Sequence, residues 1–303
     1  HRLADDLRAR HPEASFKCTV DTAPTLEREH ATRAGLGWAG KHTLLIHPTH
    51  GSYFFLGCIL TDLALQTSAE AGHPGQLLPP SDHCGTCTRC IDACPTQCID
   101  DPDETGHRSI DASRCISYLT IEHRSTIDVS MHEAMGDWLA GCDVCQDVCP
   151  FNRDEARPFE ATPKAGAEAS EASRGSEASD ASNQRAAFKL WTPTGLPVHE
   201  RYTPELPARL SLLEILDWAE GDYQQKLKGN ALKRIKLAMW KRNALIVAGN
   251  QLARAELDAS QAAALHERIA CLAGDEREDQ LVYATANQVI DRLRRAPDQP
   301  HNA

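Results

Sequence analysis

The spacing of apolar and polar residues divides the chain into regions with different expected structures. Leu3 and Leu7 lie one helical turn apart, which predicts a short helix that runs into the extended segment FKCTV. Residues 24–36 also have a helical pattern. Two apolar runs rich in β-forming residues then flank PTHG in HTLLIHPTHGSYFFLGCIL, and this pattern predicts a β-hairpin.

The second half of the chain has a different pattern. Residues 161–187 consist mostly of Ala, Ser and Glu and cannot bury enough surface to offset their ordering entropy, so we expect a disordered insertion. From about residue 205, apolar residues recur at helical spacing in LLEILDWAE, ALKRIKLAMWKRNALIVAGNQLA, SQAAALHERIACLAG and QLVYATANQVIDRLRRA. Successive amphipathic helices favour a HEAT-like repeat module, with a small helical bundle as the alternative.

Composition narrows the class of protein. The 303 residues carry a net charge of −11, which argues against a uniformly basic nucleic-acid-binding protein but allows a local basic surface. No apolar run reaches the roughly 18 residues of a membrane span, so we expect a soluble, cytoplasmic protein with no membrane partner. The sequence begins at His1 without a Met, and we interpret it as a fragment of a longer protein.

Cysteine is the most informative residue type in the chain. Nine of the 12 cysteines lie between Cys84 and Cys149, and such clustering favours metal ligation in a reducing compartment. Residues 84–95, CGTCTRCIDACP, have the spacing C-x2-C-x2-C-x3-C-P, in which three thiolates bind one [4Fe-4S] cluster and the fourth binds another. Zinc and disulfides are the alternatives, and zinc sites rarely use three cysteines at one interval.

A second set of cysteines completes this pattern. Cys115 stands alone, and GCDVCQDVCPFN supplies three more, the last of them followed by proline. By the reciprocal rule for two-cluster ferredoxins, the spacing predicts two [4Fe-4S] clusters. The first would be held by Cys84, Cys87, Cys90 and Cys149, and the second by Cys94, Cys115, Cys142 and Cys145. The remaining cysteines are expected to be structural thiols: Cys18, Cys58, Cys98 and Cys271.

Three glycines in AGLGWAGKHTLLI form a G-x-G-x-x-G pattern at Gly35, Gly37 and Gly40. A dinucleotide-binding fingerprint requires a strand before these glycines and a helix after them. Here a helical stretch precedes and a strand follows, so nicotinamide or flavin binding is disfavoured. The glycines are expected to let the backbone approach either itself or a flat ligand closely.

Four segments in a fixed order closely resemble the epoxyqueuosine reductase family. They are VDTAPTLEREHATRAGLGWAGKHTLLIHPTHGSYFFLGCILTDLAL, CGTCTRCIDACPT, RCISYLTIEHR and GCDVCQDVCPFN. The family consists of cobalamin-dependent iron–sulfur enzymes of tRNA modification, related in fold to reductive dehalogenases. The resemblance covers residues 1 to about 160 and resumes near 190. The family has a further N-terminal part that helps to enclose the cobalamin, and the insertion at 161–187 is unusual for it.

The resemblance implies a reaction. The clusters would reduce a cobalamin, which opens the epoxide of epoxyqueuosine in a tRNA anticodon loop and gives queuosine. Asp21 in VDTAP matches the family's proton donor, and a carboxylic acid can donate at neutral pH only if burial raises its pKa. From the residues alone, Asp21 is equally consistent with a cap of the helix that begins near Pro24.

Several further residues match positions beside the cofactor in this family. Lys41, His42 and Thr43 lie at the glycine-rich turn, where hydrogen bonds to corrin groups are expected and cobalt ligation by His42 is not. The alternative is an exposed turn histidine. Ser117 and Tyr118 follow Cys115 and are expected to line the same cavity, whereas residues 122–124 are equally consistent with surface polar groups.

A basic stretch is the clearest local charge feature of this acidic chain. Between Lys226 and Arg242 there are seven Lys or Arg residues and no Asp or Glu. Such a surface gains affinity from phosphates, so the stretch predicts tRNA binding, with a solvated helix face as the alternative. The residues expected to contact tRNA are Lys233, Arg234, Lys241 and Arg242. Trp240 is expected to be a core residue.

Together these features predict an α+β fold with four parts. They are a truncated cobalamin-binding α/β domain at 1–80, a two-[4Fe-4S] ferredoxin-like domain at 81–160, the disordered insertion at 161–187 and a HEAT-like tRNA-binding module at 188–303. We expect a monomer that receives electrons from an external ferredoxin or flavodoxin. The alternative functions are a reductive dehalogenase-like enzyme and a non-catalytic ferredoxin-type electron carrier.

Overall fold

The computed structural model describes residues 2–20, 23–66, 70, 83–152 and 210–295. Asp21 and the predicted insertion at 161–187 therefore lie outside the described residues. The chain divides into two compact units. Unit 1 comprises His1–Cys94, Ile99–Ile110 and Val144–Ala167, and unit 2 comprises Pro95–Cys98, Asp111–Asp143 and Glu168–Ala303.

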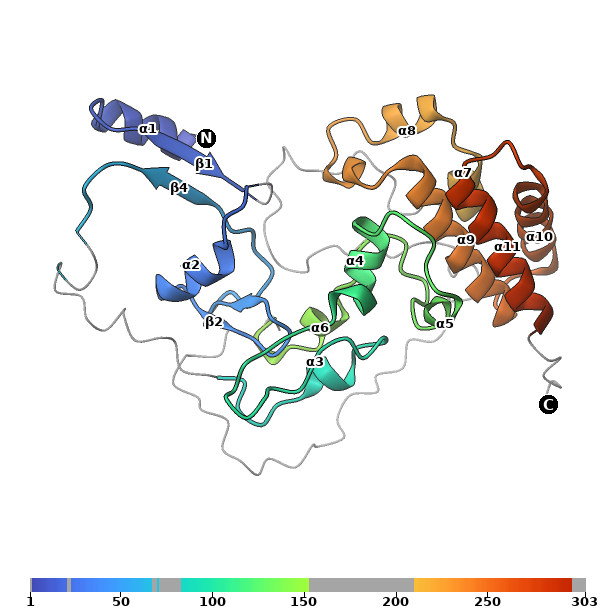
Figure 1. The fold of residues 1–303 in the computed structure, drawn as a ribbon, viewed down its shortest axis with the longest axis horizontal. Helices are drawn as coiled ribbons and strands as arrows, with labels where there is room; N and C mark the ends of the chain where they lie inside the picture. Colours follow the sequence, from blue (N-terminus) through green and yellow to red (C-terminus); the bar gives the residue numbers. More distant parts are fainter. Residues whose placement is uncertain (1, 21–22, 67–69, 71–82, 153–209, 296–303) are drawn as a thin grey trace. The chain divides into compact units, whose positions relative to one another are not determined.

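Unit 1 is built from short helices and two small antiparallel sheets (Figure 1). One sheet pairs β1 with β4 and the other pairs β2 with β3. The elements are α1 (Arg2–Arg10), β1 (Phe16–Thr19), α2 (Glu27–Arg33), β2 (Trp38–Ala39), β3 (Leu45–Ile46), β4 (Cys58–Thr61), α3 (Arg89–Asp92), α6 (Val144–Asp147) and the 3₁₀ helix η3 (Pro150–Asn152). The predicted first helix, extended segment and second helix are all present.

The predicted hairpin around PTHG is wrong in its pairing. A tight turn does form, and His47 and Gly51 exchange backbone hydrogen bonds of 2.7 and 3.0 Å. The pairing ends at that single bridge, because Leu45–Ile46 pairs instead with the preceding strand, Trp38–Ala39. The second apolar run instead supplies β4, whose residues pair with β1 far earlier in the chain.

The glycine pattern has a packing explanation within unit 1. A Cβ atom on Gly37 would lie 2.1 Å from the backbone oxygen of Ile46, and one on Gly40 would lie 2.6 Å from the Ile46 side chain. Gly35 has a φ of 74° and ends α2, since its N–H donates to the carbonyl of Thr32. The glycines therefore serve close backbone approach and a helix end, and the order is helix, turn and strand, as the sequence indicates.

The named elements of unit 2 are all helices within its described residues. Its elements are η2 (Ala112–Arg114), α4 (Ile116–Ile121), α5 (Val129–His132), α7 (Leu212–Asp217), α8 (Glu220–Lys226), η6 (Ala231–Arg234), α9 (Leu237–Ala253), α10 (Ala259–Gly274) and α11 (Gln280–Arg295). The predicted long helix from Ala231 begins only at Leu237. Asn230 caps a separate 3₁₀ turn by accepting from the N–H of Leu232, and Lys236 is extended.

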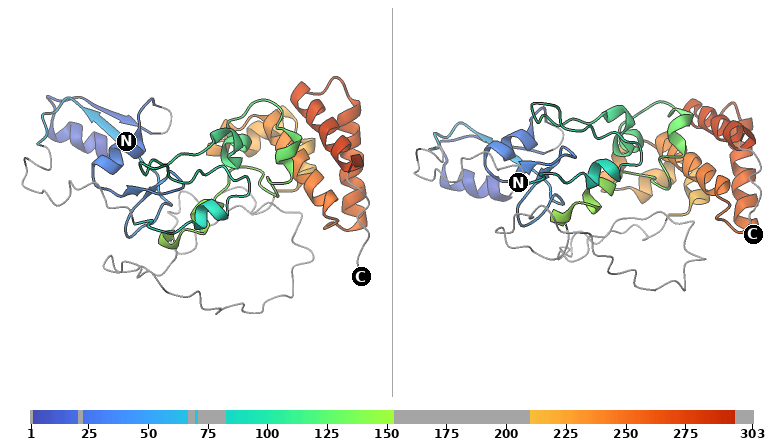
Figure 2. Two further views of the ribbon diagram at one scale, coloured as in Figure 1. Left: turned by 60° about the horizontal axis from the view of Figure 1, so that its bottom comes forward. Right: turned by 90° about the horizontal axis from the view of Figure 1, so that it is seen from below.

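Helix α9 is the centre of unit 2. Its residues from Met239 to Gln251 are all buried, and α7, α10 and α11 pack against it. Figure 2 shows α9, α10 and α11 side by side in both views. Trp240, fully buried at the middle of the largest hydrophobic core, packs edge-on against Trp218 with ring centroids 5.9 Å apart. Trp240 is thus the core residue that the sequence predicts.

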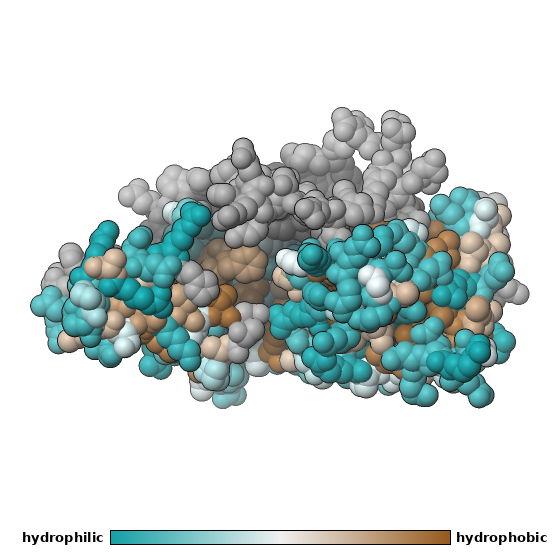
Figure 3. Space-filling view, turned by 90° about the horizontal axis from the view of Figure 1, so that it is seen from above, coloured by the Kyte–Doolittle hydropathy of each residue, from teal (hydrophilic) through white to brown (hydrophobic). Residues whose placement is uncertain are grey.

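The surface carries both polar and apolar side chains. Hydrophilic residues, drawn in teal, predominate on the face displayed in Figure 3, and hydrophobic residues in brown form smaller patches. Unit 1 exposes several large apolar side chains, among them Leu26, Phe55 and Leu65. In the described part of the chain, no helix combines the length and the apolar character needed to cross a membrane.

Candidate cluster and cofactor site

The first predicted cysteine set comes together within unit 1. Cys84 and Cys87 lie on the turn that leads into α3, and Cys90 lies within α3. Cys149 lies between α6 and η3, and α6 packs beside α3. Burial, with a smaller contribution from the nearby Cys84, Cys90 and Cys87, raises the pKa of Cys149 to about 11. Burial and the same neighbours also raise the pKa of Cys90.

These pKa shifts test whether the four sulfurs suit a metal cluster. The raised pKa values mean that Cys90 and Cys149 resist ionisation at neutral pH, so a cationic centre would be needed to hold them as thiolates. Thiolate ligands from one C-x2-C-x2-C run and one distant Cys-Pro are those that a [4Fe-4S] cluster uses. The residue types and their spacing therefore fit an iron–sulfur cluster, while no three His, Cys, Asp or Glu side chains of the described residues are grouped so that they could hold a metal ion.

The second predicted cysteine set is divided between the two units. Cys94 and Cys145 belong to unit 1, whereas Cys115 and Cys142 belong to unit 2. Within unit 2, a hydrogen bond from the buried Cys98 lowers the pKa of Cys115 to about 6. Cys98 was expected to be a structural thiol, and the structure adds that it lies beside a predicted ligand.

The hairpin of β2 and β3 packs directly on the first cysteine set. Trp38, Ile46 and Cys149 form one buried apolar cluster, with Cys84 and Phe151 at its edge. The Trp38 ring contacts the Phe151 ring edge-on, with centroids 4.8 Å apart. The glycine-rich turn that follows β2 is therefore held close to the sulfurs of Cys84 and Cys149.

A polar clamp fixes the Cys149 segment to the turn after β3. Asn152 Oδ1 accepts from the N–H of Ser52 at 2.6 Å, and its Nδ2 donates to the Ser52 hydroxyl at 2.9 Å and to the Gln146 carbonyl at 2.8 Å. A Cβ atom on Gly51 would lie 2.0 Å from Asn152 Oδ1, so only glycine fits there. The clamp joins residues a hundred positions apart in the sequence.

Two cations link the glycine-rich turn to the first cysteine run. Lys41 is buried, and its Nζ donates to the carbonyl of Gly85 at 2.9 Å. Arg108 donates from Nη1 to the carbonyl of Ala39, and the same nitrogen lies 3.8 Å from Sγ of Cys84. Lys41 thus has a structural partner beside the cluster residues, and Arg108 is a neighbour that the sequence analysis missed.

His42 has an unpaired ring nitrogen inside this site. The side chain is 4% exposed, and burial lowers its pKa to about 4, so the ring is neutral at pH 7. Its Nδ1 accepts from the N–H of Leu44 at 3.2 Å, which places the proton on Nε2. That buried Nε2–H has no hydrogen-bond partner among the described residues. A buried donor of this kind suits a polar group of a bound cofactor rather than a metal ion.

Thr43 adopts an unusual backbone conformation at the same turn. Its φ is 64°, a left-handed value that is costly for a β-branched residue, by about 1–3 kcal/mol. Arg28 holds this conformation by donating to the Thr43 carbonyl at 2.8 Å. The turn that carries Lys41, His42 and Thr43 is therefore fixed by contacts on both sides.

The other predicted cofactor residues are not among those described around the glycine-rich turn. Asp21 lies outside the described residues. Ser117 is half-buried on α4 of unit 2, where its carbonyl accepts from the hydroxyl of Thr120. Tyr118 is 39% exposed, and Glu122 forms an ion pair with Arg234.

Some residues of the basic stretch are exposed and others are buried, and Arg242 is one of the buried residues. Arg242 is fully buried and donates to the carbonyls of Leu119, His123 and Ser125. Its remaining donor contacts go to Oδ1 of Asn243, so the buried Arg242 gives no support to the prediction that it contacts tRNA. Lys241 is also buried and lies 3.6 Å from Glu278.

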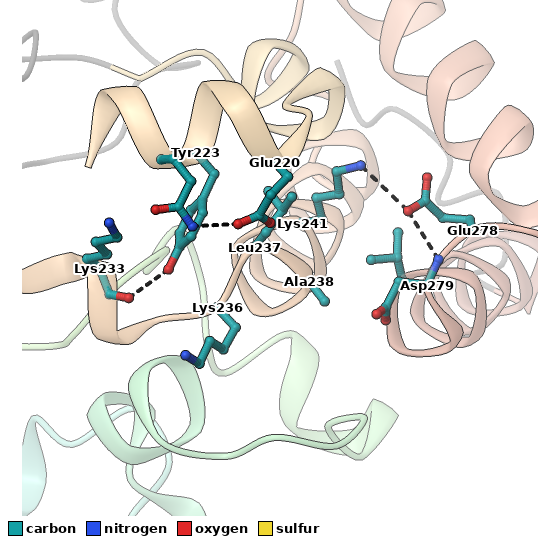
Figure 4. Close-up of a pocket in the computed structure, with 11 residues that line it drawn as sticks. Glu220, Tyr223, Lys233, Lys236, Leu237, Ala238, Lys241, Glu278 and Asp279 are labelled. Atoms are coloured by element: carbon teal, nitrogen blue, oxygen red, sulfur yellow. Dashed lines mark hydrogen bonds and ion pairs between the residues drawn. The ribbon is translucent and has the colours of Figure 1, made fainter. Parts of the chain in front are cut away.

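The remaining cations of the stretch are on the surface. Lys226 is paired with Glu214 and Arg234 with Glu122, whereas Lys228, Lys233 and Lys236 have no ion pair within the described residues. Lys233, Lys236 and Lys241 line a pocket of about 470 Å³. Figure 4 shows this pocket between α8, α9 and the start of α11, with Glu220, Glu278 and Asp279 on its walls.

Comparison with known proteins gives a consistent result. Residues 83–152 match the family of 4Fe-4S double cluster binding domains. Epoxyqueuosine reductase of Synechocystis sp. is 36% identical over 239 residues, covering 78% of this chain and 65% of that protein. The enzyme of Alicycliphilus denitrificans is 36% identical over 274 residues, covering 90% of this chain and 61% of that protein.

The chain is similar to epoxyqueuosine reductases over most of its length. The solved structure of the Bacillus subtilis enzyme has the same fold, with a TM-score of 0.63 at 23% identity, covering 96% of this chain and 61% of that one. A structure of epoxyqueuosine reductase with an epoxyqueuosine-modified tRNA stem loop gives a TM-score of 0.59 at 22% identity, covering 97% of this chain and 70% of that one. The chain spans about half to two thirds of the length of the curated epoxyqueuosine reductases it matches.

The resemblance read from the sequence is thereby confirmed, as are the mixed helix-rich fold and the iron–sulfur domain. Sequence reasoning missed Arg108, Asn152 and Asn243. Asn243 donates from α9 to the carbonyls of Thr120 and Leu139. Both carbonyls lie in the segment between the predicted ligands Cys115 and Cys142. No local motif marks these three residues, because each acts on residues distant in the sequence.

Proposed function

We propose that this chain reduces the epoxide of epoxyqueuosine in the anticodon loop of tRNA and gives queuosine. The observation that carries the proposal is the packing of the first cysteine set against the glycine-rich turn of residues 37–43 within one unit. A cluster held by these cysteines would lie beside a turn with an unsatisfied polar group. The similarity to epoxyqueuosine reductases over 78% of the chain supports this choice of substrate.

Two [4Fe-4S] clusters and a cobalamin are the proposed cofactors. Cys84, Cys87, Cys90 and Cys149 would hold the first cluster, and Cys94, Cys115, Cys142 and Cys145 the second. Lys41, His42, Thr43 and Ser117 are the candidates for holding the cobalamin, which when bound supplies low-potential reducing chemistry at cobalt. His42 would donate from Nε2 to a polar group of the cofactor, while Lys41 stays tied to Gly85.

Proton supply follows from the balance of the reaction. Conversion of the epoxide to the alkene consumes two electrons and two protons and releases the oxygen as water. Asp21 is the proposed donor to the departing oxygen, and a carboxylic acid must have a raised pKa to do this at neutral pH. The electrons would come from an external ferredoxin or flavodoxin, with the chain acting as a monomer in the cytoplasm.

Nucleoside mass spectrometry tests the proposal. The full chain is incubated anaerobically with cobalamin, a low-potential reductant and tRNA that contains epoxyqueuosine, and queuosine is expected to form. Asp21→Asn should lower the rate by at least about 100-fold, in the range of a lost general acid, while iron and cobalamin contents stay unchanged. The same substitution at the exposed Asp5 of α1 is the control.

Two outcomes would contradict the proposal. Failure of the loaded wild-type chain to form any queuosine would remove the substrate assignment. A chain that binds iron and sulfide but no cobalamin would favour a simple electron carrier. Unchanged turnover in Asp21→Asn would remove only the role of Asp21.

A further inference from the structure

Arg108 is presented to the first cysteine set by a stiffened loop. Residues 99–110 form a hairpin-like loop closed by the bridge between Ile99 and Ile110. Within the loop, one carboxylate oxygen of Asp103 accepts from the N–H groups of Thr105 and His107, both at 2.9 Å. This turn directly precedes Arg108, so the loop is fixed by its own hydrogen bonds.

The guanidinium of Arg108 lies between two functional segments of unit 1. It donates to the Ala39 carbonyl of β2 and lies 3.8 Å from Cys84 Sγ. Its charge also reaches His42, whose pKa is lowered mainly by burial and additionally by Arg108. A single half-buried cation is therefore close to a predicted cluster ligand and to the turn beside it.

Charge beside an iron–sulfur cluster changes its reduction potential. Reduction adds one negative charge, so a nearby cation stabilises the reduced form more than the oxidised form. Hydrogen bonds to the cysteine sulfurs act in the same direction and are among the features that set cluster potentials. Loss of the cation should therefore make the cluster harder to reduce.

We propose that Arg108 is a positioning residue that raises the reduction potential of the first cluster and holds Cys84 against the β2 turn. The inference rests on the proposed ligand set of that cluster and adds a determinant of its electron transfer. Lys41, which binds the Gly85 carbonyl, supports the same junction from the other side.

Redox titration of the full chain, followed by electron paramagnetic resonance, tests the proposal. Arg108→Gln removes the charge and keeps a side-chain amide, so the midpoint potential of the first cluster should fall. Arg108→Lys keeps the charge and should restore most of the potential. Arg33→Gln, at an exposed arginine of α2 that is paired with Glu29, is the control and should cause no shift.

A second measurement looks for a signal in the wild-type chain, and Arg108→Lys then assigns that signal to Arg108. Protein labelled with ¹⁵N-arginine should show a nitrogen hyperfine coupling to the reduced cluster, and Arg108→Lys should lose it. Absence of that coupling, or an unchanged or raised potential in iron-loaded Arg108→Gln, would overturn the proposal. A wild-type chain that binds only one cluster would instead contradict the proposed cofactor set.

Discussion

Arg242 illustrates how single polar residues organise the interior of unit 2. Burial lowers its pKa to about 10, so the guanidinium stays charged at neutral pH although no carboxylate is bound to it in the described structure. Its donors instead satisfy three backbone carbonyls between Leu119 and Ser125. Removing a buried charged group from its hydrogen-bond partners typically lowers the free energy of unfolding by several kcal/mol. The three carbonyls therefore hold Arg242 in the interior, although it belongs to a basic run.

His132 provides a prediction about pH. It is fully buried, and burial is the main reason its pKa falls to about 4, with Arg292 and Arg242 lowering it and Asp128 raising it. The unfolded value is near 6.5, so stability from the neutral ring is complete above pH 6.5 and is lost as pH falls toward 4. The loss should amount to about 3 kcal/mol at 1.4 kcal/mol per pKa unit.

Urea unfolding of the full chain, followed by far-ultraviolet circular dichroism between pH 7 and 4, measures this loss. His132→Gln can still donate to the Ile127 carbonyl and should flatten the pH dependence below 6.5. The same substitution at the exposed His266 of α10 is the control. An identical pH profile in His132→Gln and the wild type would contradict the assignment.

At the scale of elements, local patterns predict the helices better than the strands. The helices α9, α10 and α11 follow from apolar periodicity, because each helix hydrogen-bonds within itself. The strands β1 and β4 pair although about forty residues separate them in the sequence, and β3 pairs with the preceding strand β2. No local sequence signal distinguishes these pairings from the expected hairpin. The 3₁₀ break before Leu237 depends on the cap at Asn230, which apolar periodicity does not report.

Helix α4 contains a threonine with a testable role in linking two cysteine segments. Thr120 and Thr285 are both fully buried, and each donates to the carbonyl four residues earlier at 2.8 Å. Only Thr120 also accepts from the N–H of Gly141, at 2.9 Å, next to Cys142. Thr120→Val should therefore cost about 1–3 kcal/mol more than Thr285→Val, because it leaves a buried N–H unpaired.

Chemical unfolding gives the two stabilities, and iron analysis adds a second readout. Thr120→Val should also lose iron, since the Gly141 bond holds the residue before a proposed ligand, whereas Thr285→Val should keep it. Thr120→Ser retains the hydroxyl and should restore the iron content. Equal losses in the two valine variants would mean that the Gly141 bond has no special role.

For the whole molecule, the sequence predicts only those residues of the candidate site that belong to one short motif. The spacing of Cys84, Cys87 and Cys90 identifies a cluster without a structure, because three ligands lie in one short run. Arg108 enters through a loop closed only by the fold, and Asn152 acts across a hundred residues. The basic stretch is intermediate, since its charge is visible in the sequence while the burial of Lys241 and Arg242 is not.

The corrected basic surface leads to a prediction about tRNA affinity. Lys228, Lys233 and Lys236 remain as cations without an ion pair in the described structure. Replacing all three by Ala should weaken tRNA binding and reduce the slope of log K against log salt by about two, at about 0.7 per phosphate contact with a single strand. Fluorescence anisotropy with an anticodon stem loop between 50 and 300 mM salt, spanning about sixfold in ionic strength, measures both quantities. Arg277, Arg294 and Arg295, replaced together by Ala, give a control with the same change in net charge. If both triple variants lose affinity equally, the effect is one of net charge and the lysines form no specific tRNA surface.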